Sequence, residues 1–308
     1  MSACRRQATE TFQLTKEEAM QRTLIRILTA ACAIAGLSTA AAQEIDSVVK
    51  KLQATNTITL GYRETLLPTS YLDDQKKPTG YAIEMCMRIL DEVKAELKLP
   101  QIKVEYVPVN IQNRQALVAN GTVQLECGGT VNTFARNKQV DFSPVSYVAA
   151  SQLLVLKSSR IAKFEDLNGK VVAVATGGSS EPELKHIIET NKLNVRVINV
   201  DDHAAGLIAV ESRRADAYFN DNAAFFSLIK QSKNGANLAV VGPEYGYSPQ
   251  GFMVPKNNPT FLWIVHHAMG KMFKSGEAEK IFDKWFGPFG AKVSPKLHAA
   301  WETASYPE

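Results

Sequence analysis

The sequence has no block of one charge sign, no internal repeat and no low-complexity tract. Its 35 basic and 31 acidic residues are spread along all 308 positions, without a basic stripe interleaved with aromatic residues, and give a formal net charge of +4. A nucleic-acid-binding surface is therefore weakly supported, and we predict no nucleic-acid partner. The hydrophobic share, 45%, is ordinary for a soluble chain, and the length allows two compact lobes or one large domain.

No hydrophobic run near the N-terminus is long enough to span a membrane. The apolar run at 27–37 follows Arg22 and Arg26 and leads into Ala40-Ala41-Ala42. Basic residues, a short apolar run and small residues in this order are typical of a secretory signal peptide. A membrane anchor, the alternative, would need a longer run. We expect cleavage after Ala42, which removes residues 1–42 and predicts a periplasmic protein.

Few cysteines remain after this cleavage. Cys4 and Cys32 precede it, and lipidation at Cys32 is the minor alternative to simple cleavage. Cys86 falls on the apolar stripe of a predicted helix, and Cys127 ends a predicted strand. The sequence therefore allows either one disulfide or two buried free thiols.

Motifs of several enzyme classes are missing. No serine lies in a Gly-x-Ser-x-Gly elbow, and no Gly-Lys-Ser/Thr follows the glycine-rich segment 176–180. His266 and His267 are adjacent and point to different faces of their helix, while His186 and His298 are isolated. We therefore predict no metal site, no cofactor and no nucleophilic catalysis.

The chain does show a regular alternation of short β-branched runs and amphipathic segments. Strands alternating with helices predict parallel α/β sheets. The predicted strands are 58–62, 103–107, 122–126, 171–175, 195–200 and 215–219, and the predicted helices are 80–97, 114–118, 183–189, 204–211, 223–229, 259–273 and 277–286.

Two longer extended runs, at 148–156 and 246–254, are not followed at once by a helix and bracket several complete strand-helix units. We interpret them as two crossover strands between lobes. One continuous sheet is the alternative. The predicted organisation is lobe 1 at 43–148, lobe 2 at 149–249, and a return to lobe 1 with C-terminal helices at 250–308.

Short segments, each weak alone, form a specific set in their order and spacing from about residue 45 to about 301. They are Gly61-Tyr62-Arg63-Glu64, Gly80-Tyr81-Ala82-Ile83-Glu84, Gln112-Asn113-Arg114, Asn120-Gly121-Thr122, Glu126-Cys127-Gly128, Arg136 with Asp141-Phe142-Ser143, Asp202-His203, Asn220-Asp221, 276–280 and Lys284-Trp285-Phe286. The set resembles the type II periplasmic binding proteins for polar amino acids, and among them the glutamate/aspartate-binding branch. This resemblance implies an α/β, two-lobed type II periplasmic binding protein fold with two crossover strands.

An α-amino acid presents a carboxylate and an ammonium, so its receptor needs a cationic fork, neutral donors and one anion, shielded from water. The resemblance implies that Arg136 holds the α-carboxylate and that Asp221 holds the ammonium. Spacing alone favours a solvent-facing helix position for Arg136. It favours an N-cap position for Asp221, before the helix at 223–229.

A second ligand carboxylate needs further positive charge, and the resemblance places Arg63, Arg114 and His203 at basic positions of the branch. Arg63 follows a predicted strand and Arg114 begins a predicted helix, so both can point into a cleft at the carboxyl ends of the strands. A helix N-terminus disfavours the His203 imidazolium, whereas a ligand carboxylate favours it. Without the resemblance, surface ion pairs and solvated positions are the simpler explanation of these residues.

Small and hydroxyl residues complete the predicted site. The segment 176–180 follows a predicted strand and opens a helix, so main-chain amides, the helix dipole and Ser179 can meet a carboxylate. An ordinary strand-to-helix turn is the alternative. Gly129 and Thr130 are the remaining predicted ligand contacts.

Four positions depart from the branch. It usually has hydroxyl residues where this chain has Ile111 and Gly129, a threonine where it has Val131, and an aromatic ring where it has Thr69. Lost hydroxyls near a dicarboxylate weaken the assignment of glutamate, while the contacts expected for the α-carboxylate and the ammonium keep the amino-acid class. Another acidic or polar amino acid therefore stays open as the ligand.

The resemblance predicts the monomeric solute-binding component of an ABC importer, which captures glutamate, aspartate or a similar small acidic amino acid by lobe closure. It would pass this ligand to an ABC permease in the inner membrane and would not be an enzyme. One alternative is a cyclohexadienyl or arogenate dehydratase on the same fold, for which Glu126 and Glu181 are the acids near the cleft. The others are a binding protein for another polar amino acid and an exported sensor domain, which usually continues into a membrane segment.

Overall fold

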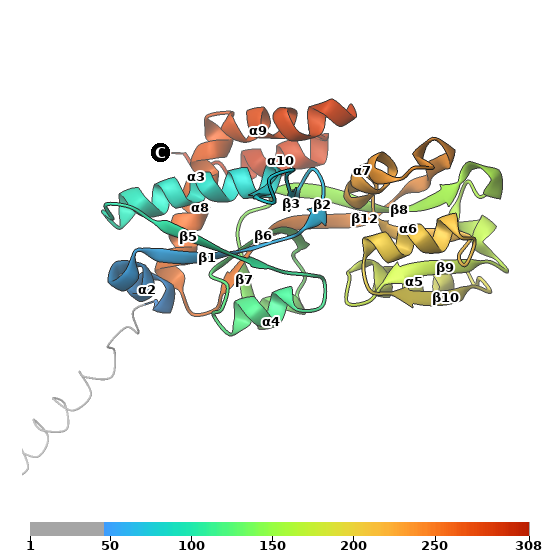
Figure 1. The fold of residues 1–308 in the computed structure, drawn as a ribbon, viewed down its shortest axis with the longest axis horizontal. Helices are drawn as coiled ribbons and strands as arrows, with labels where there is room; N and C mark the ends of the chain where they lie inside the picture. Colours follow the sequence, from blue (N-terminus) through green and yellow to red (C-terminus); the bar gives the residue numbers. More distant parts are fainter. Residues whose placement is uncertain (1–45, 308) are drawn as a thin grey trace, which may run out of the picture. The chain divides into compact units, whose positions relative to one another are not determined.

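The computed structural model describes residues 46–307, and the predicted signal peptide, Cys4 and Cys32 lie outside these residues. Strands and helices alternate along the described chain and build one long mixed sheet with helices packed on it (Figure 1). The predicted α/β class is thereby confirmed. Among the helices in 46–307, none combines the length and the apolar character needed to cross a membrane.

The main sheet has nine strands. They are β1 (Thr57–Tyr62), β5 (Lys103–Pro108), β6 (Leu125–Val131), β7 (Val140–Phe142), β8 (Tyr147–Leu156), β9 (Val171–Ala175), β10 (Arg196–Val200), β11 (Ala217–Asp221) and β12 (Leu238–Pro255). Parallel pairing joins β1 to β5 and β6, and it separately joins β9 to β10 and β11. Between the two parallel groups lie β8 and β12, which pair antiparallel with each other and with their neighbours, in the order β10-β9-β11-β8-β12-β6-β1-β5.

The strands β8 and β12 are the two extended runs that the sequence predicts as crossovers. β12 begins earlier than the predicted run at 246–254, because its first part pairs with β8 from Leu238 onward. One hydrogen-bonded sheet is continuous through these two strands. The crossover strands and the continuous sheet, which the sequence presents as alternatives, therefore coexist.

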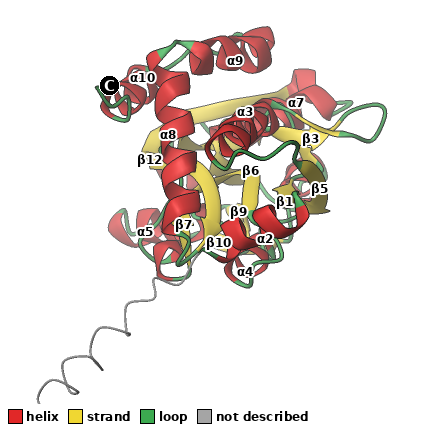
Figure 2. Ribbon diagram, turned by 90° about the vertical axis from the view of Figure 1, so that its left-hand side faces the viewer, coloured by secondary structure: helices red, strands yellow, loops and turns green. Residues whose placement is uncertain are grey.

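Helices cover both faces of the sheet (Figure 2). They are α2 (Ser47–Thr55), α3 (Tyr81–Glu96), α4 (Arg114–Ala119), α5 (Ser180–Thr190), α6 (His203–Glu211), α7 (Asn222–Gln231), α8 (Pro259–Lys274), α9 (Glu277–Phe286) and α10 (Pro295–Thr303). The sequence pattern misses α2, α10 and a small antiparallel sheet of β2 (Thr65–Leu66), β3 (Ser70–Leu72) and β4 (Pro78–Thr79). It also places β6 and β11 a few residues too early.

Buried apolar residues form separate clusters on the two sides of the crossover strands. Along β12, Phe252 and Val254 enter one cluster under α3, α8 and α9, while Met253 points to the opposite face, as strand alternation requires. On the other side, Leu153 and Leu154 of β8 divide in the same way between two further clusters. We call the two sides lobe 1 and lobe 2; their predicted boundaries after residues 148 and 249 stay a prediction.

A disulfide joins Cys86 of α3 to Cys127 of β6. Both residues are 0% exposed and belong to the apolar cluster of lobe 1. The bond answers the question that the sequence left open between one disulfide and two free thiols. It ties the long helix α3 to strand β6 across a sequence separation of 41 residues.

We expect that replacing both half-cystines, Cys86→Ala with Cys127→Ala, lowers the free energy of unfolding by about 4 kcal/mol, because the unfolded chain regains the freedom of a loop of this length. Urea unfolding of the two forms measures the difference. The wild type unfolded in dithiothreitol serves as the control and should lose stability to a similar extent. Equal midpoints for wild type, reduced wild type and variant would show that the bond contributes nothing.

Candidate functional site

A cavity of about 40 Å³ lies between the two lobes, where the parallel strands of both groups end. Of the predicted site residues, Arg63, Arg114, Gly129, Ser179, His203 and Asp221 line it. The other residues in its wall are Leu66, Thr69, Ile111, Val131, Gly178, Asn220, Ala223, Ala224 and Gln250. The structure thus brings most of the predicted residues together from distant parts of the sequence.

The two lobes are in contact around this cavity. Nε2 of Gln112 donates a hydrogen bond to the carbonyl oxygen of Asp201 at 2.6 Å. Nη2 of Arg136 donates to the carbonyl oxygen of Gly177 at 3.2 Å. Ile111, from lobe 1, packs into an apolar cluster of lobe 2. These contacts hold the two lobes together around the cavity.

Two arginines are held at the cavity by the ends of lobe 1 elements. Arg63 follows β1, and its backbone N–H donates to Oγ of Ser70 at 3.0 Å, while Arg114 is the first residue of α4. They are only 5% and 7% exposed. Burial, together with the guanidinium of Arg114, lowers the pKa of Arg63 to about 10, and burial also lowers the pKa of Arg114. Both stay charged at neutral pH, so two buried cations face the cavity.

Glu126 is the buried counter-charge of these arginines. It is 0% exposed and does not line the cavity. Burial raises its pKa, while Arg114, the Thr130 hydroxyl and Arg63 act in the opposite direction. Thr130 is also fully buried, and its Oγ1 donates to Oε2 of Glu126 at 2.9 Å. The Thr130 hydroxyl therefore contacts this internal carboxylate, and a contact of Thr130 to ligand stays a prediction.

Glu126 and Arg63 both lie against Gly128, where no side chain would fit. A Cβ atom at Gly128 would collide with Oε1 of Glu126 and would lie 2.9 Å from Cγ of Arg63. The next residue, Gly129, has φ +66°, a left-handed conformation that favours glycine, and it faces Gln250 and Thr69 across the cavity. The glycine pair lets the β6 backbone form the cavity wall.

Arg136 lies beside the cavity without lining it. It begins a short 3₁₀ turn, Arg136–Lys138, and its guanidinium donates to the carbonyl oxygens of Val131 at 2.8 Å and Gly177 at 3.2 Å. Burial, followed by the charge of Arg114, lowers its pKa to about 10. Only 9% of the Arg136 surface is exposed. The interpretation of Arg136 as a solvent-facing helix residue is therefore wrong.

Asp221 is contributed by lobe 2, at the end of β11. It occupies the N-cap position of α7, but its side chain makes no capping hydrogen bond. The carboxylate instead lies 3.5 Å from Oγ of Ser151 and 3.4 Å from Nε2 of Gln250. Burial raises its pKa, and hydrogen bonds and the charges of Arg114 and Arg136 oppose this shift. The Asp221 carboxyl group therefore lines the cavity and does not cap the helix.

His203 begins α6 and reaches the cavity from lobe 2. Its Nδ1 lies 2.8 Å from Oη of Tyr218 and 3.2 Å from the amide nitrogen of Asn220. Burial, then the charges of Arg63 and Arg114, lower its pKa to about 3. The imidazole is thus neutral at physiological pH. The Asn220 amide nitrogen can only donate, so the tautomer that accepts this hydrogen bond at Nδ1 carries its hydrogen on Nε2, which can then donate.

Several cavity residues have only weak signals in the sequence. All four positions that depart from the glutamate/aspartate branch, Thr69, Ile111, Gly129 and Val131, lie in the cavity wall. Gln250 also lines the cavity, but its only sequence signal is its place in a predicted crossover strand. These five positions set the space and the donors available to a ligand.

The sequence also matches a family model. Residues 58–288 match the bacterial extracellular solute-binding proteins, family 3. The chain belongs to this family. This solute-binding protein is 38% identical over 246 residues to the L-glutamate/L-aspartate-binding protein of Pseudomonas aeruginosa, covering 80% of this chain and 82% of the relative. It is 36% identical to the glutamate/aspartate import solute-binding protein of Escherichia coli, covering 82% of this chain and 84% of that one.

Solved structures of amino-acid-binding proteins share the two-lobed fold. An ancestral arginine-binding protein bound to glutamine superposes with a TM-score of 0.67 at 30% identity, covering 75% of this chain and 98% of that one. An ancestral amino-acid-binding protein described as a precursor of cyclohexadienyl dehydratase superposes with a TM-score of 0.67 at 27% identity, covering 78% and 100%. The predicted two-lobed fold is thus confirmed for this solute-binding protein.

The neutral state of His203 has a consequence for stability against acid. In the unfolded chain its pKa is near the ordinary 6.5, and in the folded protein it is about 3. Below pH 6.5 the unfolded state binds the extra proton, so stability falls as the pH drops from 6.5 toward 3. We expect His203→Gln to remove about 2 kcal/mol of the stability difference between pH 7 and pH 4.5.

Urea unfolding at the two pH values measures this difference. His298→Gln, an exposed histidine on α10, is the matched control and should behave as the wild type. If His203→Gln and the wild type lose the same stability on acidification, His203 is not a buried neutral group.

Proposed function

We propose that this protein captures glutamate or aspartate for an ABC importer. The charge balance at the cavity carries the proposal. The guanidiniums of Arg63, Arg114 and Arg136 outnumber the carboxyl groups of Glu126 and Asp221, whose pKa values burial raises, so positive charge is in excess beside the cavity. Glutamate and aspartate carry a net charge of one negative at neutral pH and would compensate it, whereas a neutral or basic amino acid would not.

The proposed contacts divide the ligand between the two lobes. Asp221 is the anion that can pair with the α-ammonium. Arg136 can hold the α-carboxylate once it exchanges its present hydrogen bonds to main-chain carbonyl oxygens for bonds to ligand. Ser179, at the start of α5, can add a hydroxyl donor to the same group.

The second carboxylate of the ligand would lie near Arg63 and Arg114, the two arginines that line the cavity. The neutral His203 can donate from Nε2 to the same carboxylate without adding a charge. Relatives at 36–38% identity whose names state glutamate and aspartate binding support the same class of ligand here.

Ligand binding would be coupled to movement of the lobes about β8 and β12. A ligand that docks on the arginines of lobe 1 gains Ser179, His203 and Asp221 only when lobe 2 is closed, so it favours the closed form. Closure excludes water and strengthens every charged contact. The family's role in import supports delivery of the loaded, closed protein to an ABC permease in the inner membrane, and the predicted signal peptide supports a periplasmic location.

A binding role is better supported than catalysis. Glu126, one acid considered for a dehydratase, does not line the cavity and is engaged by Thr130. The other, Glu181, accepts from the backbone N–H of Gly177 at 3.1 Å and from Nδ2 of Asn199 at 2.7 Å, and it too lies outside the cavity wall. Neither acid is placed to protonate a leaving hydroxyl in the cavity.

Titration calorimetry with each common amino acid tests the proposed ligand class. We expect one molecule of glutamate or aspartate to bind per chain, and arginine, lysine and the neutral amino acids to bind at least tenfold more weakly. Incubation with prephenate and arogenate, followed by product analysis, should show no turnover. Tightest binding by a neutral or basic amino acid, or turnover of either compound, would overturn the proposal.

A pair of charge-removing variants tests the two ends of the site. We expect Asp221→Asn and Arg114→Met each to weaken binding by about 3 kcal/mol, roughly 100-fold, because each leaves a ligand charge buried without its partner. Asp283→Asn, an exposed aspartate on α9, is the matched control and should bind as the wild type. Unchanged affinity in Asp221→Asn would remove it from the ammonium contact.

A further inference from the structure

A second cluster of chemically active side chains lies in lobe 1, outside the cavity between the lobes. Glu92 and Glu96 of α3 are one helical turn apart and share a face. His267 of α8 faces them where the two helices pack. One ligand atom from each of the three residues lies within 4.8 Å of the other two. None of them lines the cavity between the lobes.

The distances in this cluster match those between the ligands of a metal ion. Nδ1 of His267 is 3.2 Å from Oε1 of Glu92 and 3.6 Å from Oε1 of Glu96. Around a tetrahedral Zn²⁺, nitrogen and oxygen ligands at about 2.0–2.2 Å lie about 3.3–3.6 Å from each other. The single hydrogen or lone pair on Nδ1 can serve one carboxylate, and 3.6 Å is too long for a hydrogen bond. Two carboxylates and one ring nitrogen thus converge at spacings that a shared cation could occupy.

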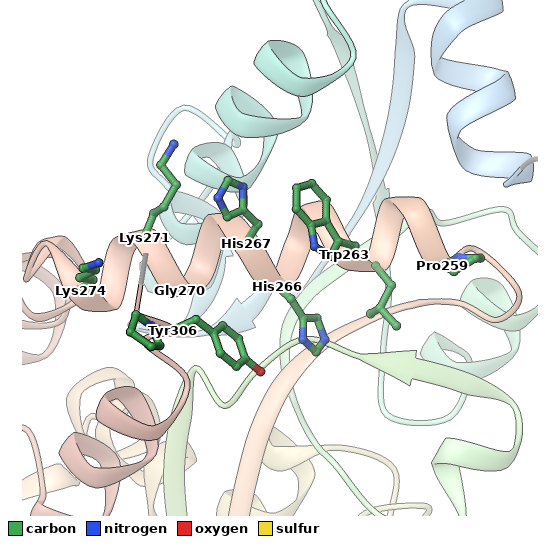
Figure 3. Close-up of a pocket in the computed structure, with 10 residues that line it drawn as sticks. Pro259, Trp263, His266, His267, Gly270, Lys271, Lys274 and Tyr306 are labelled. Carbon is green, nitrogen blue, oxygen red and sulfur yellow. The ribbon is translucent and has the colours of Figure 1, made fainter.

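The surroundings of the cluster orient its members and leave it reachable. The indole of Trp263 stacks on the imidazole of His267, with ring centroids 4.9 Å apart and planes at 19°, which fixes the ring. Figure 3 shows Trp263, His267 and Lys271 along one side of α8. His267 and Lys271 also line a groove of about 810 Å³ on the surface of lobe 1. The side chains of Glu92, Glu96 and His267 are 15%, 36% and 24% exposed, so an ion from solvent can enter.

Lys271 modulates the charge of the cluster. Its Nζ lies 2.8 Å from Oε2 of Glu92, the oxygen that does not face His267. A carboxylate held in this way keeps its other oxygen directed at the cluster, as carboxylates do when a neighbour supports a metal ligand. The lysine also cancels one of the two negative charges, which weakens the attraction for a cation.

We propose that Glu92, Glu96 and His267 bind one divalent transition-metal cation, Zn²⁺ or an ion of similar preference, with water in the remaining position. Imidazole and carboxylate ligands suit this class of cation. The bound ion bridges α3 and α8 and stabilises lobe 1, independently of the amino acid between the lobes. The histidine spacing in the sequence does not reveal this site, because its ligands come from helices far apart in the chain.

Calorimetry with ZnCl₂ on the full protein, without a polyhistidine tag and after treatment with a chelator, tests the site. We expect one Zn²⁺ per chain and a melting temperature that rises with Zn²⁺ concentration. His267→Gln and Glu96→Gln should each weaken Zn²⁺ binding at least tenfold. Lys271→Gln should strengthen it, because the competing positive charge is gone. The affinity for glutamate, the proposed ligand of the cavity between the lobes, should stay the same in these variants.

His298→Gln is the matched control, because His298 lies 3.5 Å from the single carboxylate of Glu302 on an exposed helix. It should bind Zn²⁺ as the wild type does. No Zn²⁺ binding by the wild type would overturn the proposal, and so would equal Zn²⁺ affinity in His267→Gln, Glu96→Gln and the control. If the three residues form only an ion pair, His267→Gln should lower the melting temperature by the same amount with Zn²⁺ and with chelator. That result would also overturn the proposal of a metal site.

Discussion

The buried ionic cluster around Glu126 is the constraint on which the site depends. Moving a guanidinium out of water costs several kcal/mol unless an opposite charge and hydrogen bonds replace its hydration. In lobe 1 that replacement is a single, fully buried carboxylate oriented by Thr130. Because the Glu126 carboxylate and an arginine side chain both lie against position 128, only glycine fits there. The β6 backbone, the disulfide partner Cys127 and the cationic wall of the cavity therefore belong to one structural unit.

This cluster also explains why the two lobes can differ in role. Lobe 1 supplies fixed positive charge that is incompletely balanced by its own carboxylate. Lobe 2 supplies an aspartate that can oppose this charge, together with a neutral imidazole and small residues at the starts of helices. In the proposed function, a ligand with two carboxylates and an ammonium would meet complementary groups only when both lobes contribute, so affinity and closure would have the same physical origin.

The regular parts of the fold follow from the sequence because each strand or helix carries its own pattern. The helix 80–97 is predicted from its apolar spacing and is found as α3, and 171–175 is predicted and found as β9. The strand β6 is placed too early because Gly128 and Gly129 lower its strand propensity, and only the close approach of Arg63 and Glu126 reveals why glycines stand there. α10 has an N-terminal signal, with Ser294 as N-cap and Pro295 at the first turn, which periodicity alone does not detect.

The sequence points to most of the residues that line the cavity. It does not predict their charge states or the residues with which they pair. Arg63, Arg114 and Asp221 carry signals from strand and helix ends and from the resemblance. The lowered pKa of His203 depends first on burial and then on two arginines from the other lobe. The charges that act on Glu126 come from Arg114 and Arg63, which lie on other elements of the chain. The Cys86–Cys127 bond likewise depends on the packing of α3 against β6. Such pairings join distant parts of the chain, and composition and local periodicity do not encode them.

The two crossover strands make lobe 1 discontinuous in the chain, whereas lobe 2 is built from consecutive residues between β8 and β12. Lobe 2 can therefore assemble from contacts that are nearby in sequence as soon as its segment is available. The core of lobe 1 includes Phe252, Phe282 and Trp301, so its assembly has to await the final part of the polypeptide. The arginine-bearing half of the cleft would thus be the last to mature, and a nascent chain would present a structured lobe 2 before it could retain any solute.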